Sequence, residues 1–402
     1  MPLSGRTAYW DSVGSAVAEG LFSKRRGVEG KVPLISGESV TAICNAEPAG
    51  FILSLSSGRL AHLALRDPAG RPGITVTIMR GYGTGMMGGF LGALRAGSSR
   101  RDIVAVRAGR ILRMGEREII VATARGNFSR WQANRSGTYA NITDIDARDS
   151  ILSAIEQVAP DEVQLRSKDA FVIVDAAVGE NHDAVEGDNH DVDVLVLASF
   201  MPTPNSPGAL HVLVSLKFRS SGRLDVCDVH VVRCYTTPLE EAKTRPRLYL
   251  PRPGRTAFLV FSRAVVLVST QKPDVDDDQM NEDTEDRGAF EDVVDFRGDL
   301  NVEIVGSGPE DVMFDSTPRS DMMGSFTSDA GATGAGKKIR NPGVMLVARG
   351  AGIVRLETFD LEPVKTRVPT EPVKVKSKIE QAVFYGVKED VCRHRDPMNP
   401  KK

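Results

Sequence analysis

The feature that most constrains the fold is a set of four short strand-like runs that recurs along the chain. The first set lies between Ser39 and Met79, the second between Asp102 and Ile145, and the third between Asp169 and Val232. Each run is rich in Val, Ile and Leu, and Gly-containing turns separate many of the runs, as antiparallel strands require. Partial copies continue from 247 to 359. Four strands repeated every ~40–60 residues predict an all-β fold of β-propeller blades.

About five blades can be recognised, and a propeller usually closes with four to eight. A β-sandwich is the competing all-β architecture, although the regular repeat favours blades. The opening run SGRTAYWDSV is typical of the end of a blade, so we expect the chain to begin inside a larger protein. Ser57-Gly58 is expected to form a tight hairpin turn between two strands of the first set.

Four segments interrupt or follow the strand pattern. Residues 148–159 place Ile151, Leu152, Ile155 and Val158 at helical spacing, which predicts a short surface helix. The acidic segment 274–291 and the Gly/Ser-rich segment 316–341 are predicted to be disordered loops. Residues 387–402 form a polar tail.

Composition excludes several classes of function. The chain has 402 residues, 41% of them hydrophobic, and a net charge of −2. This charge argues against nucleic-acid binding, which requires a basic surface. No apolar run approaches the ~20 residues of a transmembrane helix, and the N-terminus lacks a signal-peptide core. The four scattered cysteines indicate a reducing compartment, the cytosol or nucleus.

The stretch Gly81–Arg101, GYGTGMMGGFLGALRAGSSRR, carries the pattern G-x-G-x-x-G at Gly83, Gly85 and Gly88. In a dinucleotide site this pattern joins a parallel strand to a helix. The neighbouring runs resemble antiparallel hairpins without a crossover helix. Nucleotide binding is therefore disfavoured here.

The same stretch can be amphipathic. On a helix its large apolar side chains form a broad stripe suited to a lipid surface: Met86, Met87, Phe90, Leu91 and Leu94. Its five glycines within residues 85–97 each cost a helix ~1 kcal/mol relative to Ala, so such a helix would form only on a membrane. The alternative is a loop whose apolar residues pack on the propeller.

No other motif supports an enzyme, a metal site or a cofactor. The segment GATGAGKK carries Gly331, Gly336 and Lys337 of a phosphate-binding loop, but Lys338 replaces the required Ser or Thr. A polar cluster has a poor arrangement for a metal and is expected to be a solvated loop: His182, Asp183, Asp188, His190, Asp191 and Asp193. We therefore predict a non-enzymatic protein with no cofactor and no metal.

Several longer motifs carry a resemblance to a known family. They are SGRTAYWDSVGSAVAEGL, GESVTAICNAEPAGFILSLSSGRLAHLALRDPAGRPGI, GGFLGALR, FEDVVDFR and SKIEQAVFYG, and the resemblance runs from about Thr7 to Gly386. Together they resemble the N-terminal β-propellers of the nucleoporin 133/155 family, in a fungal form.

The resemblance implies a structural role at the nuclear pore complex in the nuclear envelope. It implies a scaffold subunit of the Y-shaped outer-ring complex that supports nucleocytoplasmic transport, including mRNA export, and has other nucleoporins as partners. It also implies a seven-bladed propeller followed by a helical stack, so we expect the first blades and the stack to be missing from this chain. Animal relatives carry a curvature-sensing loop, which makes the apolar residues of 81–101 a candidate contact with the lipid bilayer.

Overall fold

The computed structural model describes most of the predicted strands. The described residues are 3–10, 12, 14, 17, 27–67, 69–80, 102–113, 115–179, 191–201, 208–238, 241, 244–252, 254–270, 290–299, 301–310 and 343–358. The segments 81–101, 316–341 and 387–402 lie outside them. Most of the acidic segment predicted at 274–291 also lies outside them, and its last residue, Glu291, begins β18.

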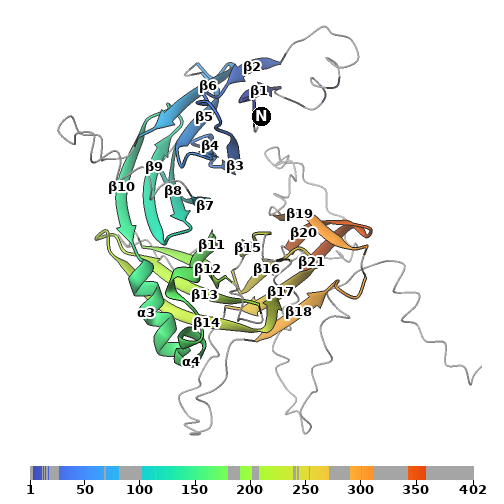
Figure 1. Cartoon of the computed structure of the whole chain (residues 1–402). Helices are drawn as coiled ribbons and strands as arrows, with labels where there is room; N and C mark the ends of the chain where they lie inside the picture. Colours follow the sequence, from blue (N-terminus) through green and yellow to red (C-terminus); the bar gives the residue numbers. More distant parts are fainter. Residues whose placement is uncertain are drawn as a thin grey trace, which may run out of the picture. The chain divides into compact units, whose positions relative to one another are not determined.

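The chain divides into two compact units, Met1–Leu248 and Tyr249–Lys402. In the first unit, β1 (Arg6–Tyr9) pairs with β2 (Val28–Lys31), and three four-stranded sheets follow (Figure 1). The strands of the three sheets are β3 (Val40–Asn45), β4 (Phe51–Leu55), β5 (Leu60–Arg66) and β6 (Pro72–Met79); β7 (Ile103–Arg113), β8 (Glu116–Thr123), β9 (Asn127–Asn134) and β10 (Tyr139–Asp146); and β11 (Phe171–Val178), β12 (Val192–Phe200), β13 (Ala209–Phe218) and β14 (Leu224–Thr237).

The second unit continues the same pattern. One sheet has the order β15 (Arg247–Tyr249, at the boundary of the units), β16 (Thr256–Val260), β17 (Ala264–Ser269) and β18 (Glu291–Asp295). The next has the order β19 (Glu303–Pro309), β20 (Gly343–Arg349) and β21 (Gly352–Glu357). In all five of these sheets spatial order follows chain order, so each is a meander of the kind that forms a propeller blade. A sandwich would instead exchange strands between two sheets.

Side chains alternate between the two faces of each strand, so one sheet contributes to two hydrophobic cores. In β8, Ile120 and Ala122 join a cluster with residues of β11–β14, whereas Ile119 and Val121 join a cluster with residues of β3–β6. Successive side chains of a strand point to opposite faces, so an apolar run with period two fills both interfaces. Consecutive four-stranded sheets of the first unit therefore pack face to face. In the second unit a similar core joins residues of β16–β18, such as Phe258, to residues of β20 and β21, such as Leu346.

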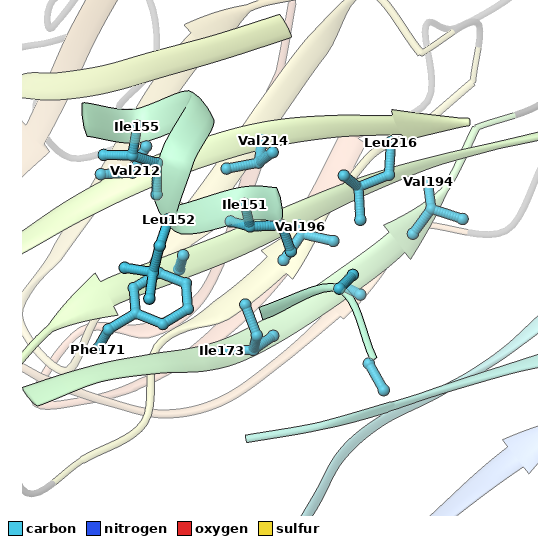
Figure 2. Packing of buried hydrophobic residues seen from close by; sticks show 14 of the residues in the cluster. Ile151, Leu152, Ile155, Phe171, Ile173, Val194, Val196, Val212, Val214 and Leu216 are labelled. Atoms are coloured by element: carbon cyan, nitrogen blue, oxygen red, sulfur yellow. The ribbon is translucent and has the colours of Figure 1, made fainter. Parts of the chain in front are cut away.

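The expected helix is present as α3 (Arg148–Val158). Figure 2 shows Ile151, Leu152 and Ile155 directed into the cluster that also contains Phe171, Val212 and Val214. Val158, which we placed on the same apolar face, is instead exposed. A second short helix, α4 (Pro160–Gln164), and a 3-10 turn (Lys168–Ala170) follow it and were not predicted.

The expected turn at Ser57-Gly58 is also present between β4 and β5. Gly58 has a φ of 82° and donates its N–H to the Leu55 carbonyl over 2.8 Å. Only glycine adopts this left-handed conformation without steric cost. The strand β2 was missed, because Val28–Lys31 is short and contains a glycine that packs against Ile74.

Candidate functional site: the connection between β6 and β7

The apolar residues predicted to contact a membrane, Met86, Met87, Phe90, Leu91 and Leu94, lie outside the described residues. The structure does describe the two strands between which they lie. β6 ends at the buried Met79 in one sheet, and β7 begins at Ile103 in the next. The candidate segment therefore connects consecutive sheets.

Both ends of this connection are held by hydrogen bonds. The Tyr139 hydroxyl in β10 donates to the Ile78 carbonyl over 3.0 Å and accepts the Arg80 N–H over 3.2 Å. At the other end, the Ala124 N–H donates to the Asp102 carbonyl over 2.8 Å. The Tyr139 ring also packs near Trp131, with ring centroids 6.3 Å apart. The described residues on either side of the segment are thus held at fixed points.

The surroundings of this connection argue against a dinucleotide site. Gly83, Gly85 and Gly88 lie outside the described residues, as do Gly331, Gly336 and Lys337. The strands on either side, β6 and β7, belong to different sheets, and each pairs in antiparallel fashion with its neighbour. A dinucleotide fold needs a strand and a crossover helix leading into a parallel partner, which these two sheets do not supply.

The polar cluster considered for a metal is only partly described. Asp191 accepts hydrogen bonds from Arg219 Nη1 and from the Ser220 N–H, both over 2.9 Å, and Asp193 lies 3.5 Å from the Lys217 ammonium. Burial would raise the pKa of Asp191, but these hydrogen bonds and the Arg219 charge outweigh it and lower that pKa. His182, Asp183, Asp188 and His190 lie outside the described residues. Within the described part of the chain, no three His, Cys, Asp or Glu side chains gather as a metal site.

Sequence reasoning missed a buried ionic junction at Asp175 in β11. The Asp175 side chain is fully buried, and its Oδ1 lies 2.5 Å from Arg107 Nη2 in β7. Its Oδ1 also accepts the Ala176 N–H over 2.8 Å, and its Oδ2 accepts the Leu248 N–H over 2.9 Å. Burial raises the pKa of Asp175, with Arg107 and the two backbone donors opposing the rise. The one available signal was an aspartate inside the apolar run FVIVDAAV.

Two further buried carboxylates are paired with arginines. Glu118 in β8 bonds to the guanidinium of Arg130 in β9. Glu38 accepts hydrogen bonds from Arg59, including one over 2.9 Å from Nε, from the Ser57 hydroxyl, and from the Ile35 N–H over 3.0 Å. Burial would raise the pKa of Glu38, but these bonds outweigh it and lower the pKa to about 2. Both pairs lie within single sheets and their adjoining loops, which indicates a structural role.

The two buried histidines also have partners inside the fold. His62 Nε2 bonds to the Ala49 carbonyl, and His211 Nε2 lies 2.6 Å from the Thr237 hydroxyl. Burial, reinforced by the nearby Arg166 charge, lowers the pKa of His211 to about 4. These two partners, a backbone carbonyl and a threonine hydroxyl, differ from the serine and aspartate that flank a catalytic histidine. Among the described helices, none is long and apolar enough to cross a membrane.

Comparison with known proteins identifies the family. Residues 1–355 match the family model described as Nup133 N terminal like. The chain is 37% identical over 411 aligned residues to nucleoporin NUP133 of Chaetomium thermophilum, covering 97% of this chain and 29% of the relative. It is 24% identical to nucleoporin nup132 of Schizosaccharomyces pombe, covering 96% of this chain and 29% of that relative. The chain therefore spans under a third of the length of these relatives.

A solved structure supports the fold. The β-propeller domain of Vanderwaltozyma polyspora Nup133 superposes with a TM-score of 0.60 at 16% identity, over 88% of this chain and 78% of that one. The propeller prediction is thereby confirmed. The relatives are nucleoporins, components of the nuclear pore complex at the nuclear envelope, which bears out the expected family and location. This chain belongs to the Nup133 N-terminal-like family of nucleoporin β-propellers.

Proposed function

We propose that the chain is the propeller part of a structural nucleoporin that acts as a scaffold in the Y-shaped outer ring of the nuclear pore. The match of residues 1–355 to the nucleoporin family carries this proposal. The role requires no catalysis and no cofactor. Its partners are other nucleoporins of the same ring, and through them the chain supports nucleocytoplasmic transport.

The finer part of the proposal concerns residues 81–101, which we assign to the membrane of the nuclear envelope. Residues 296–302 suffice to connect β18 to β19 in the next sheet, whereas residues 80–102 connect β6 to β7. A connection much longer than its geometry requires is a frequent place for function. The segment concentrates Met86, Met87, Phe90, Leu91 and Leu94, whose insertion would contribute about 0.8 kcal/mol for each CH₂ group buried in lipid.

The energetics favour curved membranes. The glycines of the segment oppose a helix in water by about 1 kcal/mol each, which offsets much of the gain from insertion. Binding then requires packing defects that expose enough apolar area, and these are most frequent in small vesicles. The segment has few charges, so anionic lipids are not needed.

Flotation of the purified chain with small and large neutral vesicles tests the membrane role. We expect binding to small vesicles only, and loss of that binding in Phe90→Asp/Leu94→Asp. The control is Val158→Asp/Leu165→Asp, which adds two acids at side chains that are 54% and 82% exposed on the helical insertion. Equal binding to both sizes, or equal loss in the control, would contradict curvature sensing through 81–101.

A second candidate function is a protein-docking platform without membrane contact. The exposure of Val158 in α3, which lies beside β14, and of Leu165 after α4 favours it, because apolar side chains on a helical insertion are suited to a protein partner. In that case neither vesicle size binds the chain. Co-purification with other outer-ring nucleoporins then depends on Val158 and Leu165 and not on Phe90 and Leu94.

A further inference from the structure

The sheet β19–β20–β21 has three described strands, whereas each of the four sheets before it has four. In those four sheets the last strand in the chain is also the last in space: β6, β10, β14 and β18. Chain order and spatial order agree in β19–β20–β21 as well. A fourth strand of this sheet would therefore lie beside β21 and follow it in the sequence.

The position of β21 in the sheet is suited to a further strand beside it. One face of β20 and β21 is buried through Leu346, Val354 and Leu356. On the other face, Ile353 is 72% exposed and stands opposite Val347, which is 49% exposed. In the described sheet β21 is paired on one side only, and the backbone N–H and C=O groups along such an edge are a template for pairing with another strand.

The sequence after β21 contains one run that fits. Residues 379–387 read IEQAVFYGV, in which Ile379, Val383, Tyr385 and Val387 share one side of a strand. Nine residues exceed the six of β21. No proline interrupts the run, whereas the preceding segment contains Pro363, Pro369 and Pro372.

The length of the connection is also compatible with pairing. Residues 358–378 would connect β21 to this run, and that is 21 residues. Residues 270–290, also 21 residues, already connect β17 to its antiparallel partner β18. The still longer segment 310–342 connects β19 to its partner β20. Long insertions between paired strands are thus a property of this fold.

We propose that residues 379–387 form the fourth strand of this sheet and pair antiparallel with β21. The segment completes the blade from within the chain. It occupies the outer edge of β21, so it removes an edge to which another polypeptide could add a strand.

Hydrogen exchange of the full chain, read by mass spectrometry, tests the pairing. We expect protection in both 352–357 and 379–387. Val383→Pro removes a ladder N–H and should lower protection in both segments by at least about tenfold. Val375→Pro makes the same change in the connection and should leave both segments protected.

Three outcomes would overturn the proposal. One is exchange of 379–387 at the rate of an unstructured peptide in the full chain. Another is a Val383→Pro variant in which 352–357 keeps its protection. The third is protection of 352–357 that increases with protein concentration alongside dimer formation, which would show that a second copy covers β21. Light scattering on the same samples separates this last outcome from pairing within one chain.

Discussion

Arg107 Nη2 lies 2.5 Å from Asp175 Oδ1, and this contact joins β7 of one sheet to β11 of the next. The two residues are 68 positions apart in the chain. The carboxylate is fully buried, whereas the Arg107 side chain remains 29% exposed. Asp175 also accepts the N–H groups of Ala176 and Leu248, so one buried side chain links β7, β11 and Leu248.

We expect Asp175→Ala to destabilise the fold by about 3 kcal/mol or more, because it leaves Arg107 and the Leu248 N–H without their buried acceptor. Urea denaturation measures the change. The matched control is Asp193→Ala in β12, whose partly exposed pair with Lys217 should contribute less than about 1 kcal/mol. Equal losses in the two variants would contradict a special role for the buried junction.

Glu38 should make the fold sensitive to acid. Its pKa is about 2 when folded, below the ordinary value of 4.5, so its contribution to stability is complete above about pH 4.5 and is lost as the pH falls toward 2. We expect Glu38→Gln to reduce stability at neutral pH by about 2–3 kcal/mol and to flatten the loss between pH 4.5 and 2. Denaturant titrations across this range measure both effects. An unchanged acid slope would show that the pairing with Arg59 does not persist in solution.

His211 should make the stability of the fold depend on pH in a higher range than Glu38 does. Its folded pKa of about 4 lies below the ordinary 6.5, so the unfolded chain binds more protons between these values, and stability falls as the pH is lowered from 6.5 to 4. His211→Gln should remove up to about 3 kcal/mol of this pH dependence. Burial also lowers the pKa of His62, so the His211→Gln variant should keep the part of the pH dependence that His62 contributes. Thr237→Val is the control, since it removes the hydrogen-bond partner of His211 but no titrating group.

The helical insertion should be stabilised by one face only. Ile155 is fully buried in the cluster of Figure 2, so Ile155→Ala should cost about 2–5 kcal/mol through the cavity it leaves. Val158 lies about one turn further along α3 at an exposed position, so Val158→Ala should change stability by less than about 0.5 kcal/mol. Thermal unfolding of the two variants compares them directly. A similar loss in both would mean that α3 is packed differently in solution.

The repeat of four strands, the hairpin turn at Gly58 and the helix α3 could all be predicted from the sequence. Each depends on local patterns: period-two alternation, a glycine at a left-handed position, or apolar residues at helical spacing. β2 was missed because Val28–Lys31 is short, and its place in the fold depends on pairing with β1 and packing near β6. The candidate membrane residues of 81–101 were selected from composition alone and stay a prediction.

The sequence by itself determined most of the strands, their grouping into repeated sets and the family to which the chain belongs, because these follow from periodicity and from motifs that are continuous in the chain. Only the tertiary structure decided which charged residues are buried together. Arg107, Asp175 and Leu248 are separated by more than 60 residues at each step, and no local pattern marks them as partners. The contact between Arg107 and Asp175 depends on how two sheets of the first unit pack face to face, since that packing brings a charge on β7 within hydrogen-bonding distance of β11.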